Sequence, residues 1–159
     1  MARDAPRLLV IFNPVAGSSR SRRFQLTLAR LRRRGCPITV RETMRRGDAE
    51  DIARTADLTE TDIVVAAGGD GTINEVINGL VGRDHPLALI PLGTANVLAA
   101  EIGISTNPDD VADVIADGIA TPVCLGRING RWFLMMAGIG FDAHVVAAVS
   151  PAVKRLIGK

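Results

Sequence analysis

A glycine-rich turn between an apolar run and an amphipathic segment constrains the fold of this chain more than any other feature. The run from Asp62 to Ala67 precedes the turn and has the composition of a buried central strand. Thr72 and Glu75 follow at capping-box spacing, which predicts a fixed helix start. Apolar residues then recur at helical spacing: Ile73, Val76, Ile77 and Leu80. A strand, a glycine turn and a helix in direct succession predict an open α/β sheet with a ligand crevice at the turn.

The chain as far as Gly118 repeats the alternation of short apolar runs with helix-period segments. Further strands are predicted over Arg7 to Phe12, Ile38 to Glu42 and Leu87 to Leu92. Helical segments are predicted around Phe24, Leu28 and Leu31, from Asp48, over Asn96 to Ile102, and from an N-cap at Asn107 with Val111, Val114 and Ile115 inward. Repeated βα units of this kind predict a Rossmann-like, doubly wound and mostly parallel sheet, of the α/β class.

The pattern changes after Gly118. Thr121 to Ile128 and Arg131 to Met136 are β-rich and are joined by Asn129-Gly130, a strong hairpin signal. We expect Trp132 to pack within this hairpin. A lone hairpin is marginally stable in water and needs a partner surface. We therefore expect an α/β domain over residues 1–120 and the incomplete start of a second, β-rich domain over residues 121–159.

Composition narrows the class of protein. The 159 residues suffice for one domain with a proper core, and no apolar run approaches the roughly 20 residues of a membrane span. The first apolar stretch lacks a small-residue cleavage site, so a cytoplasmic location is expected. Cys36 and Cys124 are far apart and form no ligand motif, which predicts two buried core residues and no zinc site.

Arginine is concentrated in the first third of the chain, although the formal net charge is only +2. The cluster comprises Arg20, Arg22, Arg23, Arg30, Arg32, Arg33, Arg34, Arg41, Arg45 and Arg46. Two interpretations stay open. The arginines could form a solvated helix surface, or a basic face that meets anionic lipid headgroups or nucleotide phosphates. We expect no nucleic-acid partner.

The glycine turn itself predicts a phosphate ligand. Gly68, Gly69 and Gly71 leave backbone N–H groups accessible, and the following helix N-terminus attracts anions. Asp70 within such a cradle is unfavourable unless it meets a cation or a sugar hydroxyl. Neither GxxxxGK[ST] nor GxGxxG after the first strand is present, which argues against a P-loop NTPase and a dinucleotide dehydrogenase.

The segment GGDGTINEVINGL, from Gly68 to Leu80, resembles the nucleotide loop of the diacylglycerol kinase catalytic domain, a family that includes sphingosine, ceramide and bacterial lipid kinases. Four further segments follow the family's order: Asn13-Pro14 with Gly17, Thr43 ahead of Gly47-Asp48-Ala49, Pro91 to Asn96, and Gly138 to Ala143. These five motifs cover almost the whole chain.

The resemblance implies an ATP-dependent lipid kinase of the NAD kinase and diacylglycerol kinase-like fold, with a β-sandwich as its second domain. It implies nucleotide contacts from Asn13, Thr43, Gly68, Gly69, Asp70, Gly71, Thr72, Asn74, Glu75, Gly93 and Thr94. Asp70 would organise Mg²⁺ or the ribose, and Asp142 would lie near the lipid. The family's general base comes from later in the second domain, and this sequence offers no candidate. Structural roles for Asn13, Thr43, Asn74 and Glu75 stay open.

Two alternatives differ from a lipid kinase. An NAD kinase shares the GGDG loop, although the Pro91 to Asn96 loop fits it less well. A non-catalytic nucleotide-binding or membrane-associating domain would use the arginine-rich face. The resemblance implies a lipid substrate at a membrane surface, hence peripheral membrane association, and the unfinished hairpin edge predicts a homodimer. We expect the chain alone to bind MgATP and to transfer phosphate poorly.

Overall fold

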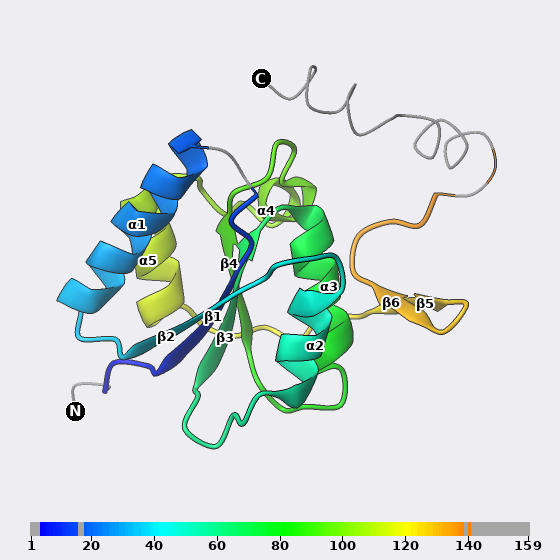
Figure 1. Cartoon of the computed structure of the whole chain (residues 1–159), viewed down its shortest axis with the longest axis horizontal. Coiled ribbons are helices and arrows are strands. Elements are labelled where there is room, and N and C mark those ends of the chain that lie inside the picture. Colours follow the sequence, from blue (N-terminus) through cyan, green and yellow to red (C-terminus); the bar gives the residue numbers. More distant parts are fainter. Residues whose placement is uncertain (1–3, 16–17, 139, 141–159) are drawn as a thin grey trace.

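The structure is a computed structural model and describes residues 4–15, 18–138 and 140. Its main sheet has four parallel strands in the order β2-β1-β3-β4 (Figure 1). The strands are β1 (Leu8–Phe12), β2 (Ile38–Glu42), β3 (Ile63–Gly68) and β4 (Leu87–Pro91). The register sets Val10 opposite Val40 on one side and Val65 on the other. The predicted parallel sheet is therefore confirmed.

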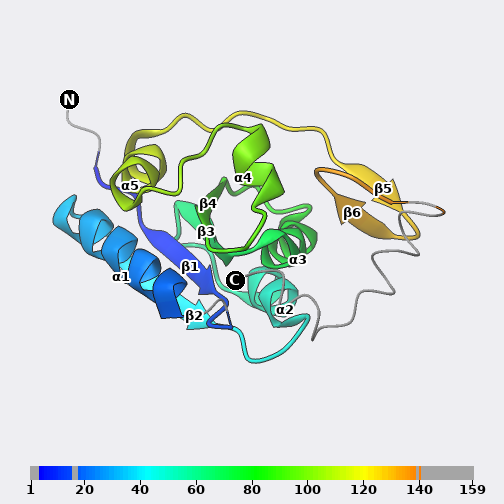
Figure 2. The ribbon, with the colours of Figure 1, turned by 90° about the horizontal axis from the view of Figure 1, so that it is seen from above.

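Helices cover both faces of this sheet, as a doubly wound fold requires. They are α1 (Ser18–Arg33), α2 (Asp48–Thr55), α3 (Asp70–Leu80), α4 (Val97–Glu101) and α5 (Pro108–Asp117). Figures 1 and 2 show α1 and α5 on one face, and α2 and α3 on the other. The topology places every crossing helix between consecutive parallel strands, so the carboxyl ends of all four strands lie at one edge.

Alternate residues along the strands pack into two separate cores. Val10 and Phe12 point toward α1 and α5, whereas Leu9 and Ile11 point toward α2 and α3. Phe12 stacks on Phe24 of α1, with ring centroids 3.8 Å apart and an interplanar angle of 7°. Because both faces are covered, the central strands β1 and β3 are apolar along their whole length, as the sequence of β3 predicts, whereas the edge strand β2 carries Arg41 and Glu42.

Ion pairs join the first and the last of these helices. Arg30 of α1 pairs with Asp109 of α5, and Arg34 pairs with both Asp113 and Asp117. Two residues of the arginine-rich region, Arg30 and Arg34, therefore pair with the acidic side chains of α5. Arg46, by contrast, is exposed to solvent.

Three local predictions are wrong. The capping box does not form: α3 begins after Gly69 without a side-chain cap, because Thr72 already lies inside the first turn. On α5, Val114 is 48% exposed and Ala112 is buried instead, because the face that packs on the core consists of Val111, Ala112 and Ile115. Cys124 is exposed because it precedes the hairpin outside either core, whereas Cys36 is buried as predicted.

The predicted hairpin forms, with shorter strands than expected. The antiparallel strands β5 (Gly126–Ile128) and β6 (Arg131–Phe133) flank Asn129 and Gly130, which have φ of 48° and 79°. The Arg127 guanidinium lies 5.0 Å from the centre of the Trp132 ring, so this tryptophan packs within the hairpin as expected. Of the helices among the described residues, none has the length and apolar character needed to cross a membrane.

Candidate functional site

The ends of the four parallel strands meet at one edge of the sheet, and backbone hydrogen bonds tie their loops together. Asn13 N donates to Ala67 O at 2.9 Å, and Thr43 N donates to Phe12 O at 2.9 Å. Leu92 N donates to Gly68 O at 2.8 Å. The sequence-predicted loops after β1, β2, β3 and β4 are therefore neighbours in space.

At the glycine loop, the segments that follow β3 and β4 lie in close contact. Gly68 closes β3, and Gly69 is the extended residue before α3. A Cβ on Gly93 would lie 2.6 Å from Gly69 Cα, and a Cβ on Gly68 would lie 2.5 Å from Thr72 Oγ1. Side chains are therefore excluded from the junction between the two loops.

Gly71 differs from these glycines because nothing lies within 4 Å of where its Cβ would be. It belongs to the first turn of α3, an 11-residue helix whose first N–H groups have no partner within the helix. An open helix N-terminus with bare backbone is suited to an anion such as phosphate. The open turn at Gly71 thus has the geometry expected of the predicted phosphate-binding turn, and phosphate binding itself stays a prediction.

Thr72 and Asn13 contact each other across the edge. Asn13 Nδ2 donates to Thr72 Oγ1 at 3.1 Å, and Asn13 Oδ1 accepts from Val15 N at 3.1 Å. Thr72 is only 6% exposed. Because its oxygen accepts the amide proton, the Thr72 hydroxyl keeps its own hydrogen to donate.

Glu75 holds the loop after β2. Its Oε1 accepts from Gly47 N at 3.0 Å, and Gly47 has a left-handed backbone with φ of 92°. Asp48 supports the same loop by accepting from Met44 N at 2.8 Å and Arg45 N at 3.0 Å. The Met44 backbone bond is the main cause of a lowered Asp48 pKa. Two carboxylates therefore fix the loop that contains the buried Thr43.

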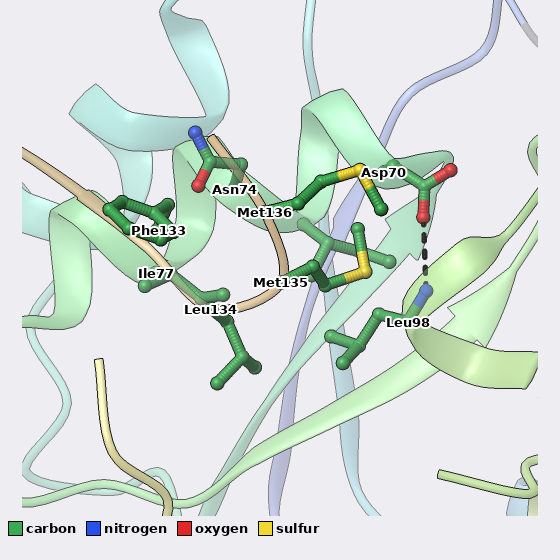
Figure 3. A pocket seen from close by; sticks show the side chains of 9 residues that line it. Asp70, Asn74, Ile77, Leu98, Phe133, Leu134, Met135 and Met136 are labelled. Carbon is green, nitrogen blue, oxygen red and sulfur yellow. Dashed lines mark hydrogen bonds between the residues drawn. The ribbon is translucent and has the colours of Figure 1, made fainter. Parts of the chain in front are cut away.

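Asp70 lies where the glycine loop meets a pocket of about 160 Å³. Its Oδ1 accepts from Leu98 N at 3.4 Å, as Figure 3 shows. Asn74 lies beside it on the same helix. The remaining wall is apolar and consists of Ile73, Ile77, Leu98, Phe133, Leu134, Met135 and Met136. Asp70 is thus the charged group of a mostly apolar pocket.

A magnesium ion fits this site only as a companion of a bound phosphate. Within residues 4–15, 18–138 and 140, no three His, Cys, Asp or Glu side chains are grouped so as to hold a metal. Mg²⁺ is commonly bound by one or two carboxylates together with substrate phosphates. Asp70 is a carboxylate at the predicted phosphate-binding turn, so its chemistry suits that arrangement.

The loop after β4 contributes Gly93, Thr94 and Asn96. Thr94 is exposed at this turn, and Asn96 is buried with a left-handed φ of 47°. Asn96 Nδ2 donates to Gly93 O at 2.9 Å, whereas its buried Oδ1 has no partner among the described residues. The sequence predicts Asn96 as a motif residue and as the start of a helix, whereas α4 begins at Val97 and Asn96 precedes it with a left-handed backbone, which asparagine tolerates better than most residues.

One predicted site residue cannot be placed in the structure. Asp142, assigned to the lipid, lies outside the described residues. The segment from Phe133 to Met136 lines the pocket and was not predicted to do so, because the hairpin signal says nothing of what the hairpin packs against.

Comparison with known proteins agrees with this geometry. Residues 7–128 match the family model of the diacylglycerol kinase catalytic domain. A diacylglycerol kinase of Bacillus subtilis (strain 168) is 35% identical, covering 96% of this chain and 52% of its own length. A Pseudomonas aeruginosa protein named "Probable lipid kinase YegS-like" is 39% identical, covering 95% of this chain and 49% of its own.

Solved structures give the same result. A crystal structure of a diacylglycerol kinase from Bacillus anthracis superposes with a TM-score of 0.67 at 28% identity, covering 84% of this chain and 51% of that one. The chain spans about half the length of the curated relatives it matches.

Proposed function

This chain belongs to the diacylglycerol kinase catalytic-domain family, and we propose that it is the nucleotide-binding part of an ATP-dependent lipid kinase. One observation carries the proposal. The open phosphate-binding turn at Gly71 and an apolar pocket meet at a single carboxylate, Asp70. A phosphate donor and an apolar acceptor would therefore approach each other at this residue.

On the donor side, the ATP phosphates lie on the turn from Gly68 to Thr72. The Thr72 hydroxyl and the first N–H groups of α3 donate hydrogen bonds to phosphate oxygens. Asn13 orients Thr72, and Glu75 holds the loop of Thr43. Asn74, Gly93 and Thr94 complete the proposed nucleotide contacts along the same edge.

On the acceptor side, the lipid hydroxyl approaches Asp70 from the apolar pocket. Asp70 would hold Mg²⁺ together with the phosphates, and the bound ion would supply positive charge against the phosphate oxygens. The bond between the γ-phosphorus and the bridging oxygen of ADP breaks while the lipid oxygen bonds to phosphorus. The lipid proton passes to a base. We place this base in the portion of the relatives' chains that the present sequence does not span. We assign Asp142 to lipid recognition and residues 121–159 to the start of that second, β-rich part.

Calorimetric titration with MgATP tests the proposal. Asp70→Asn should weaken MgATP binding about tenfold or more, the loss expected for one charge-assisted contact. Asp84→Asn changes an exposed aspartate in the loop after α3 and should leave the affinity unchanged. A folded chain that binds no MgATP would contradict the proposal, and tighter binding of NAD would indicate an NAD kinase.

A second candidate, membrane association, rests on the loops after β1 and β2. Val15 and Met44 lie in these loops and are 86% and 91% exposed, and Arg46, two residues after Met44, is exposed as well. We propose that these loops contact anionic lipid at the cytoplasmic membrane surface. Flotation with phosphatidylserine vesicles should recover the wild-type chain, and Met44→Ser with Arg46→Ser should reduce recovery. Equal recovery on neutral vesicles would argue against the charged contact. Self-association through the hairpin edge remains a proposal, testable by sedimentation.

A further inference from the structure

The side chain of Asn78 pairs with the backbone of Trp132 as a neighbouring strand would. Asn78 Nδ2 donates to Trp132 O at 2.9 Å, and Trp132 N donates to Asn78 Oδ1 at 3.0 Å. One amide thus satisfies both polar backbone groups of the central residue of β6. The proposed function gives Asn78 no role.

A second contact holds the same strand. Arg131 Nη1 bonds to Glu50 Oε2 of α2 at 2.7 Å. The helices α2 and α3 that supply Glu50 and Asn78 are themselves in close contact, since a Cβ on Gly79 would lie 2.4 Å from Glu50 O. The hairpin therefore contacts a closely packed pair of helices.

The hairpin has no core of its own to fix its position. Its strands have three residues each, and no residue of either strand is buried. An isolated two-stranded hairpin of this size is marginal in water. Contacts with α2 and α3 must therefore set where it lies.

That position decides the shape of the pocket at Asp70. Phe133 follows Trp132 directly, and the chain from Phe133 to Met136 forms the pocket wall opposite α3 (Figure 3). Asn78 also donates to Asn74 O at 2.8 Å, one turn earlier on α3, where Asn74 lines the same pocket. Asn78 thus joins the two walls.

We propose that Asn78 is a positioning residue of the acceptor side: it holds β6 on α3 and so sets the apolar wall that faces Asp70. This inference rests on the proposed lipid kinase function. Asn78 touches neither phosphate nor acceptor in this assignment and acts through Trp132 and Phe133. The nucleotide turn at Gly71, two helical turns away, does not depend on it.

Intrinsic fluorescence reports directly on this contact. Trp132 is the only tryptophan, and the chain contains no tyrosine. Asn78→Ala removes both hydrogen bonds and should raise the ratio of undocked to docked hairpin roughly 5- to 30-fold. Acrylamide quenching of Trp132 should rise accordingly. Arg131→Ala should produce a smaller rise, because it removes a partly exposed ion pair.

Asn107→Ala is the matched control. It deletes the N-cap amide of α5, on the opposite face of the sheet, and lowers stability by a similar mechanism without touching the hairpin. Quenching in this variant should equal that of the wild type. Equal quenching in Asn78→Ala would overturn the docking role.

Binding titrations separate the inference from the function on which it rests. Dihexanoylglycerol, a short-chain diacylglycerol, serves as acceptor probe, and MgATP reports on the nucleotide turn. We expect Asn78→Ala to weaken dihexanoylglycerol binding about 5- to 30-fold while MgATP affinity stays within about twofold of wild type. Released tryptophan with unchanged probe affinity, or a wild type that binds no probe, would overturn the positioning role. A wild-type chain that binds no MgATP would instead refute the proposed function.

Discussion

The main sheet and the hairpin are both β-structure, yet they are stabilised in opposite ways. Every residue of β1 is buried, and the sheet is enclosed by two apolar cores. No residue of β5 or β6 is buried, and the hairpin is held by an amide, an ion pair and a stacked guanidinium. The residues that flank it, Leu125, Leu134 and Met135, pack partly buried against the second core. Apolar burial thus determines the first region, whereas polar contacts and the packing of these flanking residues together position the second.

The candidate site draws on both regions. The residues proposed for the phosphate donor lie on a sheet edge that the cores fix. The apolar wall at Asp70 lies on a segment held by the Asn78 amide and by the packing of Leu134 and Met135 on the second core. Core substitutions should therefore change global stability. Substitutions at the hairpin should change local order and leave global stability nearly unaltered.

The largest expected effect is in the core beneath β1. Phe24→Ala should lower the free energy of unfolding by about 3–5 kcal/mol, because it removes a buried ring stacked on Phe12. Leu26→Ala, on the exposed side of the same helix, should cost less than about 1 kcal/mol. Urea denaturation followed by far-ultraviolet circular dichroism measures both. Equal losses would remove the distinction between core and surface.

Two glycines of α3 give a sharper comparison within one helix. Gly79→Ala should destabilise by about 1–3 kcal/mol, because its Cβ would meet Glu50 O at 2.4 Å and force α2 away. Gly71→Ala should stabilise by up to about 1 kcal/mol, because its site is open and alanine favours helix. Thermal unfolding tests the pair. Gly79→Ala should also increase Trp132 quenching, since Glu50 anchors Arg131.

A smaller effect is expected inside the hairpin. Arg127→Ala removes the guanidinium over Trp132, a contact worth about 0.5–1 kcal/mol at an exposed site. Tryptophan emission should shift, while the urea midpoint seen by circular dichroism stays that of the wild type. Arg32→Ala, which removes an exposed arginine from α1, is the control for loss of charge. A lower midpoint for Arg127→Ala would mean that the hairpin stabilises the whole domain.

The smallest effect concerns an ion pair at the other end of the sheet. Hydrogen bonds from the Arg7 side chain and backbone hold the pKa of Asp62 at about 2. A lowered pKa stabilises the fold at pH values above the ordinary pKa of aspartate, and this contribution is lost as pH falls through about 2. Asp62→Asn should thus be slightly less stable than wild type at pH 7 and equal to it near pH 2. A difference that persists at pH 2 would contradict this cause.

Most of the sheet was predictable because its signals are local. A buried strand such as β3 is a continuous apolar run, and glycine at the strand end marks the turn. The rule that parallel strands end at one edge then predicts that Asn13 and Thr72, 59 residues apart, lie near each other.

Contacts between distant polar side chains were not predictable from spacing. Glu75 has the spacing of a capping partner, but its carboxylate bonds to Gly47 N, 28 residues away. The pairing of Asn78 with Trp132 spans 54 residues and leaves no pattern in either segment. Val114 has inward periodicity and is half-exposed, because the buried face of α5 is made by Val111, Ala112 and Ile115.

The contact between α1 and α5 has a consequence for synthesis of the protein. Phe24 and Leu28 share one core with Val111 and Ile115, and Arg30 meets Asp109 across 79 positions of sequence. During translation α1 leaves the ribosome before α5 is made, so the part of its apolar side that packs on α5 stays uncovered over that interval. This face of the sheet is complete only when α5 docks, and until then the nascent chain exposes apolar side chains.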